Sequence, residues 1–268
     1  MLGKRIISAG IGIIILIAIL TANSIFVNIG VAAISIIALY ELLNAAESKR
    51  NMSLNMVAYM SALVFAFSNF IDPSFIPFFI YAYVIVMFLF ILIFHRTVQF
   101  SDIAINSFAI IYICFTFMYV VLVRYLPHGN IYVWMIFLGA FTTDTFAFFA
   151  GTLLGKHKLW PEISPKKTVE GAIGGVIGCG LSFLLFGYIM HFFLHYNVNY
   201  TNLFIIGVVC SVVSQIGDLS ASVIKRQYGI KDFGKIMPGH GGVMDRFDSI
   251  LFAAPAVYYL LKALVIIL

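Results

Sequence analysis

Most of this 268-residue chain consists of apolar segments that are each long enough to cross a membrane as a helix. Hydrophobic residues make up 62% of the sequence and charged residues 10%, which is more apolar surface than a water-soluble core can bury. A spanning helix needs about 20 mainly apolar residues. The segments that qualify are 6–21, 25–43, 54–71, 75–94, 103–123, 131–150, 171–194, 202–222 and 249–267. We therefore expect an all-α polytopic membrane protein with about nine transmembrane helices, because strands of a membrane barrel would alternate apolar and polar residues.

The positions of the basic residues predict how these helices are oriented. With the N-terminus in the cytoplasm, 14 of the 16 Lys and Arg residues are cytoplasmic, and Arg124 and Lys262 are the exceptions. Cytoplasmic loops of membrane proteins carry such an excess of positive charge. The sequence thus predicts a multi-pass protein of the cytoplasmic membrane, with its N-terminus inside and its C-terminus outside. The same distribution accounts for the net charge of +5, because basic residues in short loops interact with anionic lipid headgroups. We therefore expect no nucleic acid as a partner.

Unusual polar residues are concentrated in the second half of the chain. Residues 1–140 place few charges within apolar segments and are expected to form a transmembrane scaffold. Residues 141–268 are expected to form a catalytic region whose site faces the cytoplasm. The three cysteines, Cys114, Cys179 and Cys210, all lie in apolar segments, a pattern typical of core filling.

A polar stripe follows the segment 202–222 and continues past its end. Polar residues recur there at steps of three and four, so that they share one face of a helix: Ser211, Ser214, Gln215, Asp218, Ser222 and Lys225. A carboxylate within an apolar segment costs about 2.5–3.5 kcal/mol to insert and usually serves function. Asp218 is therefore expected to face the protein interior. The alternative is a structural pairing with Lys225 or Arg226.

A glycine-rich loop precedes the last apolar segment. It contains, in order, His240, Gly241, Gly242, Asp245, Arg246 and Asp248. The glycines leave backbone amides accessible to a phosphate. Carboxylates at the start of a helix are also favoured by the helix dipole, which is one interpretation of Asp245. The other is that Asp245 shares a Mg²⁺ with Asp218, because Mg²⁺ typically takes one or two carboxylates together with phosphate oxygens and water.

A third polar segment lies between the apolar segments 131–150 and 171–194. Ser164-Pro165 predicts a turn, and Thr168 is expected to cap the helix that follows. Lys166 and Lys167 stand beside that helix start, where exposed N–H groups favour an anion. The segment is therefore a candidate phosphate site, and the alternative is a basic loop that only orients the protein.

Asp144 and a row of glycines belong to the helices on either side of this loop. Asp144 lies near the cytoplasmic end of the segment 131–150 and is expected either to contact a ligand or to orient a lysine. The glycines Gly171, Gly174, Gly175 and Gly178 form a small-residue face. Such a face is typical of closely packed membrane helices.

The stretch from Ser222 to Asp248 resembles the signature of the phosphatidate cytidylyltransferases, also called CDP-diacylglycerol synthases. The matching residues are Ser222, Ile224, Lys225, Arg226, Lys231, Asp232, Gly234, Pro238, His240, Gly241, Gly242, Val243, Asp245, Arg246, Phe247 and Asp248. Met237 is the one departure, since that signature usually has Leu, Ile or Phe there. The segment from Ser164 to Gly171 and Asp144 also match the family's habit.

The resemblance implies an all-helical, Mg²⁺-dependent membrane enzyme that acts as a homodimer and converts CTP and phosphatidate to CDP-diacylglycerol and pyrophosphate. Asp218 and Asp245 would hold the metal, and His240 would orient a substrate, because the attacking phosphate is already anionic and needs no base. The residues expected to hold phosphates are Lys166, Lys167, Lys225, Arg226, Lys231 and Arg246. Further substrate contacts are expected from Asp144, Ser164, Thr168, Ser222, Asp232, Gly241, Gly242 and Asp248.

Two other functions remain open at this point. A CTP-dependent lipid kinase would also need to bind CTP and a lipid but would transfer the γ-phosphoryl group. An anion transporter would gather polar residues near the middle of the membrane from several helices. The polar residues of this chain cluster at one membrane face, which favours an enzyme.

Overall fold

A computed structural model describes residues 2–46, 52–236 and 241–268, which are almost wholly helical. The α-helices are α1 (Leu2–Thr21), α2 (Ser24–Ala45), α3 (Met52–Ala66), α4 (Ile76–Ile93), α5 (Phe100–Ala109), α6 (Thr116–Arg124), α7 (Gly129–Leu154), α8 (Val169–Leu194), α9 (Tyr200–Gln227) and α10 (Met244–Ala263). A π-helical stretch, Ile110–Phe115, joins α5 to α6, and short 3-10 turns cover Ser68–Phe70 and Pro73–Phe75. Strands β1 (Lys158–Trp160) and β2 (Ser164–Thr168) form an antiparallel hairpin.

Six helical segments are long and apolar enough to cross a membrane. They are Ser24–Ala45, Ile76–Ile93, Phe100–Arg124, Gly129–Leu154, Val169–Leu194 and Tyr200–Gln227. The prediction of an all-α protein with many apolar helices is confirmed to this extent, with six such helices in the described residues in place of nine. Helix α3 has 15 residues, or about 22 Å, which is shorter than a hydrocarbon layer of about 30 Å. Helix α10, which is not among the six, begins with a charged turn.

The chain packs as two compact units. Unit 1 comprises Met1–Tyr125 and Asp232–Asp245, and unit 2 comprises Leu126–Lys231 and Arg246–Leu268. This division follows packing, whereas the predicted boundary at residue 140 separates scaffold from catalysis and stays a prediction. The short segment 232–245 thus belongs with the first half of the chain, although the residues on either side of it belong with the second.

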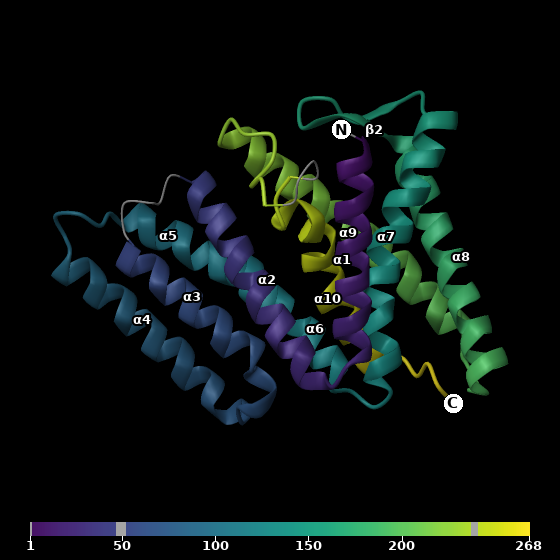
Figure 1. Cartoon of the computed structure of the whole chain (residues 1–268), viewed down its shortest axis with the longest axis horizontal. Helices are drawn as coiled ribbons and strands as arrows, with labels where there is room; N and C mark the ends of the chain where they lie inside the picture. Colours follow the sequence, from purple (N-terminus) through teal and green to yellow (C-terminus); the bar gives the residue numbers. More distant parts are fainter. Residues whose placement is uncertain (1, 47–51, 237–240) are drawn as a thin grey trace. The chain divides into compact units, whose positions relative to one another are not determined.

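In unit 1, α2 packs against α3 and α6, and the chain from α3 to α5 shares a core (Figure 1). The centre of that core consists of Leu54, Met87, Val98 and Ile103. Arg124 donates a hydrogen bond from its guanidinium to the carbonyl oxygen of Ala22, 3.1 Å away. This contact gives Arg124, an exception to the cytoplasmic distribution of basic residues, a structural role at the end of α1.

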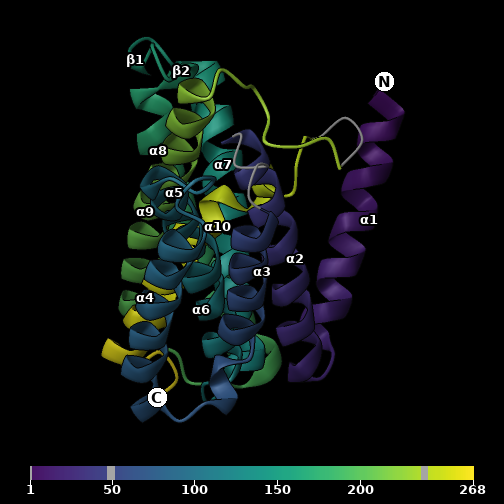
Figure 2. The same ribbon diagram turned by 90° about the vertical axis from the view of Figure 1, so that its left-hand side faces the viewer.

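In unit 2, α7, α8 and α9 lie side by side, with α8 antiparallel to both α7 and α9 (Figures 1 and 2). The glycine face of α8 packs on α7, as predicted. A Cβ atom on Gly171 would lie 2.8 Å from the carbonyl oxygen of Ala147 and 3.1 Å from the Cα of Gly151. The hairpin covers the end where α7 finishes and α8 begins, and the C-terminus lies at the opposite end.

An apolar row on α8 faces away from this packing. Its members recur at helical spacing and are each more than half exposed: Ile173, Ile177, Leu181, Leu185 and Tyr188. A soluble protein rarely exposes so continuous an apolar surface. Lipid is the solvent that suits it.

Candidate functional site

The hairpin places the predicted phosphate-binding residues at the start of α8. The hydroxyl oxygen of Thr168 accepts a hydrogen bond from the amide of Gly171 at 3.1 Å, which confirms the predicted helix cap. The turn itself occupies residues 161–163, and Ser164 pairs with Trp160 as the first residue of β2. The turn predicted at Ser164-Pro165 is therefore wrong by three residues, because Pro161 opens it.

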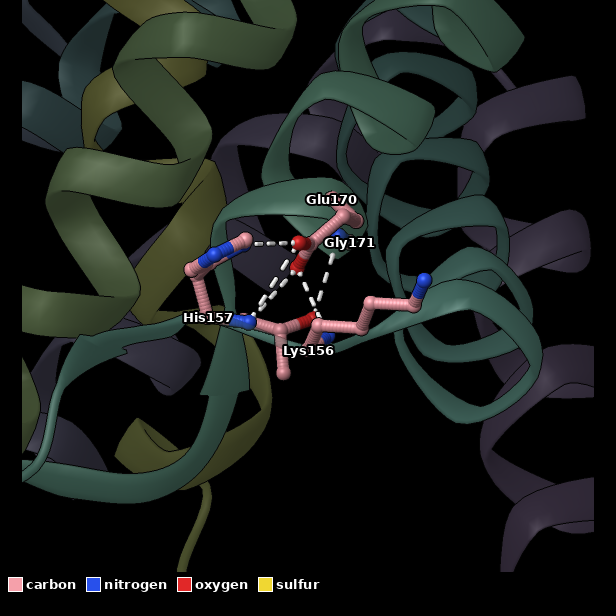
Figure 3. A network of polar contacts seen from close by, with 5 residues as sticks. Lys156, His157, Glu170 and Gly171 are labelled. Atoms are coloured by element: carbon pink, nitrogen blue, oxygen red, sulfur yellow. Dashed lines mark hydrogen bonds and ion pairs between the residues drawn. The ribbon is translucent and has the colours of Figure 1, made fainter.

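Glu170 ties the entry of the hairpin to the first turn of α8 (Figure 3). Its carboxylate accepts hydrogen bonds from the backbone amides of Lys156, at 3.1 Å, and His157, at 3.2 Å. The Nδ1 atom of His157 lies 2.6 Å from the same carboxylate. These contacts fix the connection between α7 and β1, so that Lys166 and Lys167 project from a supported backbone.

A cavity of about 520 Å³ opens beneath the hairpin within unit 2. That volume lies in the range of small-molecule sites. Polar residues in its lining come from α7, α9 and the hairpin: Asp144, Thr152, Lys158, Lys166, Lys167, Thr168, Gln215 and Asp218. The structure thus brings together Asp144, Asp218 and the Lys166–Thr168 stretch, which the sequence had marked separately.

Opposite charges meet inside this cavity. The Nζ atom of Lys167 forms an ion pair with Oδ2 of Asp218, and their side chains are 27% and 28% exposed. Asp144 and Asp248 are both repelled electrostatically by Asp218. Arg246 attracts Asp144, and Lys225 attracts Asp248. These six residues comprise three carboxylates and three cations, all in unit 2.

The polar stripe of α9 faces the protein interior, as predicted. Ser211, Ser214 and Ser222 are buried. The side-chain amide of Gln215 donates to the carbonyl oxygen of Ala172 at 3.2 Å. Beyond the stripe, Nε of Arg226 donates to the carbonyl oxygen of Ile163 at 3.4 Å, so the exposed end of α9 reaches the turn of the hairpin.

Asp245 joins the two described parts of the segment 232–245, residues 232–236 and 241–245, within unit 1. Its Oδ2 atom accepts hydrogen bonds from the amides of Phe233, at 2.8 Å, and Gly242, at 2.9 Å. Gly241 has a φ of +88°, a conformation that favours glycine. Asp232, the first residue of this segment, is exposed, as is Lys231, the residue before it in the sequence. His240 lies outside the described residues.

Glu41 is a buried acid that sequence reasoning missed. It lies near the end of α2, is 2% exposed, and accepts hydrogen bonds from the amides of Val243, at 3.0 Å, and Met244, at 2.8 Å. The signal was present in the sequence, because an acid inside an apolar segment is the same pattern that singled out Asp218.

The carboxylate in the cavity suits a metal ion that binds together with a nucleotide. Among the residues that the structure describes, no three His, Cys, Asp or Glu side chains are arranged to enclose a metal ion. Mg²⁺ bound with a triphosphate needs only one or two protein carboxylates, and Asp218 offers one within the cavity. Asp218 and Asp245 belong to different units, so the shared ion stays a prediction.

Comparison with known proteins places the chain in a family. The model of the cytidylyltransferase family matches residues 3–264. The chain belongs to the cytidylyltransferase family. This membership confirms the resemblance seen in the segment from Ser222 to Asp248.

Individual members of the family are also similar to this chain. The phosphatidate cytidylyltransferases of Staphylococcus haemolyticus and Staphylococcus saprophyticus are 44% and 45% identical to it over 163 residues, or 61% of this chain. That of Bacillus subtilis is 42% identical over 167 residues. The chain spans 60% to 61% of the length of these curated relatives.

Proposed function

We propose that this member of the cytidylyltransferase family transfers the cytidylyl group of CTP to phosphatidate, giving CDP-diacylglycerol and pyrophosphate. The observation that carries the proposal is the charged cavity of unit 2, where Lys166, Lys167 and the capped start of α8 stand opposite Asp144 and Asp218. Cations suit a triphosphate, and carboxylates suit its metal. The names of the similar proteins support the same reaction.

The chemistry asks the protein for position and charge. A phosphate oxygen of phosphatidate attacks the α-phosphorus of CTP, a new P–O bond forms, and the bond to the β-phosphate breaks with its electrons leaving on pyrophosphate. The attacking group is already anionic, so no general base is needed. Orientation and charge neutralisation therefore supply most of the rate enhancement.

The cations divide into two groups in this proposal. Lys166 and Lys167 hold the triphosphate and then the departing pyrophosphate at the start of α8. Phosphates of lipid and nucleotide are also held from the other elements by Lys225, Arg226, Lys231 and Arg246. His240 orients a substrate by donating a hydrogen bond, with further contacts from Ser164, Thr168, Ser222, Asp232, Gly241, Gly242 and Asp248.

Mg²⁺ is the metal that we propose for the site. When bound, it neutralises and polarises the phosphate oxygens of CTP. Asp218 would hold it and would then release Lys167, whose ammonium group becomes available to phosphate. Asp144 and Asp248 add negative charge around Asp218. On the grounds of the sequence motif, Asp245 is proposed as the second ligand.

Orientation and assembly complete the proposal. CTP is charged and cytoplasmic, so the hairpin and the segment 232–245 must open to the cytoplasm. The distribution of basic residues supports this orientation, with the N-terminus inside and the C-terminus outside. We further propose that α1, α10 and α3, the last together with the 3-10 turn Ser68–Phe70 that lengthens it, join the six long helices as spans, which gives nine. We also propose that the protein is a homodimer.

Isotope transfer tests the reaction. Purified protein in detergent micelles that contain both phosphatidate and diacylglycerol receives CTP labelled with ³²P at either the α or the γ position, and the lipid fraction is counted. We expect only the α label in lipid, with no transfer in excess chelator. Entry of the γ label into the lipid fraction would indicate a lipid kinase. If neither label enters the lipid fraction, both enzymatic functions are refuted.

A further inference from the structure

Glu41 offers two acceptors to two consecutive backbone donors. Its Oε1 atom receives the amide of Val243 and its Oε2 atom receives that of Met244. Met244 is the first residue of α10, where the leading N–H groups have no partner within the helix. The carboxylate supplies acceptors at the point where a helix also favours negative charge.

The backbone of the segment 232–245 comes close to this carboxylate at two more positions. A Cβ atom built on Gly234 would lie 2.6 Å from the carboxyl carbon of Glu41, and one built on Gly242 would lie 2.6 Å from the same atom. Both glycines therefore leave the space that Glu41 fills. Gly242 in turn donates its amide to Asp245, so the two acids hold one stretch of backbone from two directions.

A buried acid is an expensive way to fill space. Removing a carboxylate from water carries a large cost unless hydrogen bonds compensate, and an apolar side chain would pack against two glycines more cheaply. The backbone amides of Val243 and Met244 provide the compensation. The arrangement therefore favours a role in placing these particular backbone atoms over a role in general stability.

We infer that Glu41 is a positioning residue for cytidylyl transfer. It fixes the described residues 232–236 and 241–245, the part of the chain that carries Asp232, Gly241 and Asp245 and precedes Arg246 in the sequence. Glu41 is not proposed to touch a substrate. The inference rests on the proposed function for its effect on turnover, while its effect on the backbone is independent of that function.

Turnover in Glu41 variants tests the first part. Glu41→Gln keeps the shape but leaves one amide facing an NH₂ group, and we expect kcat to fall about 10- to 100-fold, because small misplacements of catalytic groups have such effects. The KM for CTP should change less than about threefold, since uniform binding is not lost. Glu41→Asp retains the charge and should lie between Gln and wild type.

Two further variants separate positioning from stability. Ser35→Ala is the matched control, because Ser35 is a buried polar residue of the same helix whose hydroxyl has no partner among the described residues; it should keep wild-type kcat. Gly234→Ala adds a Cβ that would lie 2.6 Å from the carboxyl carbon of Glu41, and it should lower kcat as Glu41→Gln does. Equal losses in Ser35→Ala and Glu41→Gln would overturn the inference.

A thiol probe reports on the backbone without any reaction. Val243 is 5% exposed, so a Val243→Cys side chain should react slowly with a maleimide in the otherwise wild-type protein and at least fivefold faster when combined with Glu41→Gln. Unchanged labelling together with unchanged kcat in Glu41→Gln would refute the positioning role. If wild-type protein makes no CDP-lipid, the proposed function fails. In that case faster labelling of Val243→Cys in the presence of Glu41→Gln still supports the anchoring by Glu41, and unchanged labelling contradicts it.

Discussion

The close approach of α7 and α8 at Gly171 allows a stability effect to be worked out from distances. Replacing Gly171 by alanine adds a Cβ 2.8 Å from the carbonyl oxygen of Ala147, 2.9 Å from the hydroxyl of Thr168 and 3.1 Å from the Cα of Gly151. Comfortable contacts lie near 3.5 Å, so the helices must separate by about 0.7 Å. Two of the three neighbouring atoms are backbone and cannot rotate away.

The expected cost is the difference between two terms. Overpacking of this kind costs about 1–3 kcal/mol, and we take the upper half because backbone yields little. Alanine recovers about 1 kcal/mol of helix propensity over glycine. Gly171→Ala should therefore destabilise the protein by about 1–2 kcal/mol, which lowers the melting temperature by roughly 2–8 °C for a domain of 150–250 residues.

Gly12→Ala is the control for this prediction. A Cβ on Gly12 meets no atom within 4 Å, so only the propensity gain applies and the melting temperature should stay level or rise. Thermal unfolding in one detergent, followed by tryptophan fluorescence or by loss of monodisperse protein, compares the two variants with wild type. Because Gly171 also lines the cavity, kcat/KM for CTP should fall in parallel. A Gly171→Ala protein as stable as wild type would refute the steric reasoning.

Three further predictions concern the site and the topology. Asp218→Asn and Asp245→Asn should each lower kcat roughly a hundred- to a thousandfold, and the double variant should be hardly worse, because the two act as one unit; near-wild-type turnover with unchanged Mg²⁺ dependence would contradict the assignment. Thr168→Ala should cost about 1 kcal/mol in unfolding experiments through loss of the cap, and an unchanged melting curve would speak against it. In a Cys-free background, a cysteine at Lys235 should resist a membrane-impermeant thiol reagent until cells are lysed, whereas one at Asn197 should react in intact cells; the reversed pattern would overturn the orientation.

Local patterns in the sequence were enough to predict several features of the structure. The three- and four-residue spacing around Asp218 predicted an inward-facing stripe, and Ser211, Ser214 and Ser222 are buried. Thr168 caps α8 as its position before an apolar segment indicated. These features depend on residues within one or two helical turns, where periodicity and capping preferences apply directly.

Contacts between distant residues could not be predicted in this way. The ion pair of Asp218 is with Lys167 of the hairpin, whereas helical spacing could suggest only Lys225 or Arg226. Hydropathy counted residues 54–71 as one span, but the helix ends at Ala66 and a 3-10 turn follows. The sharing of a metal by Asp218 and Asp245 and the role of His240 stay predictions.

The hydrogen bonds of Glu41 join residues that are 202 and 203 positions apart in the chain. At a translation rate of about 5–20 residues per second, the ribosome makes Glu41 roughly 10–40 s before it makes Val243. For that interval the acid must stay hydrated at the membrane surface or be held by the insertion machinery. A chain that stalls before residue 243 therefore leaves α2 with a carboxylate that lacks both of these backbone donors.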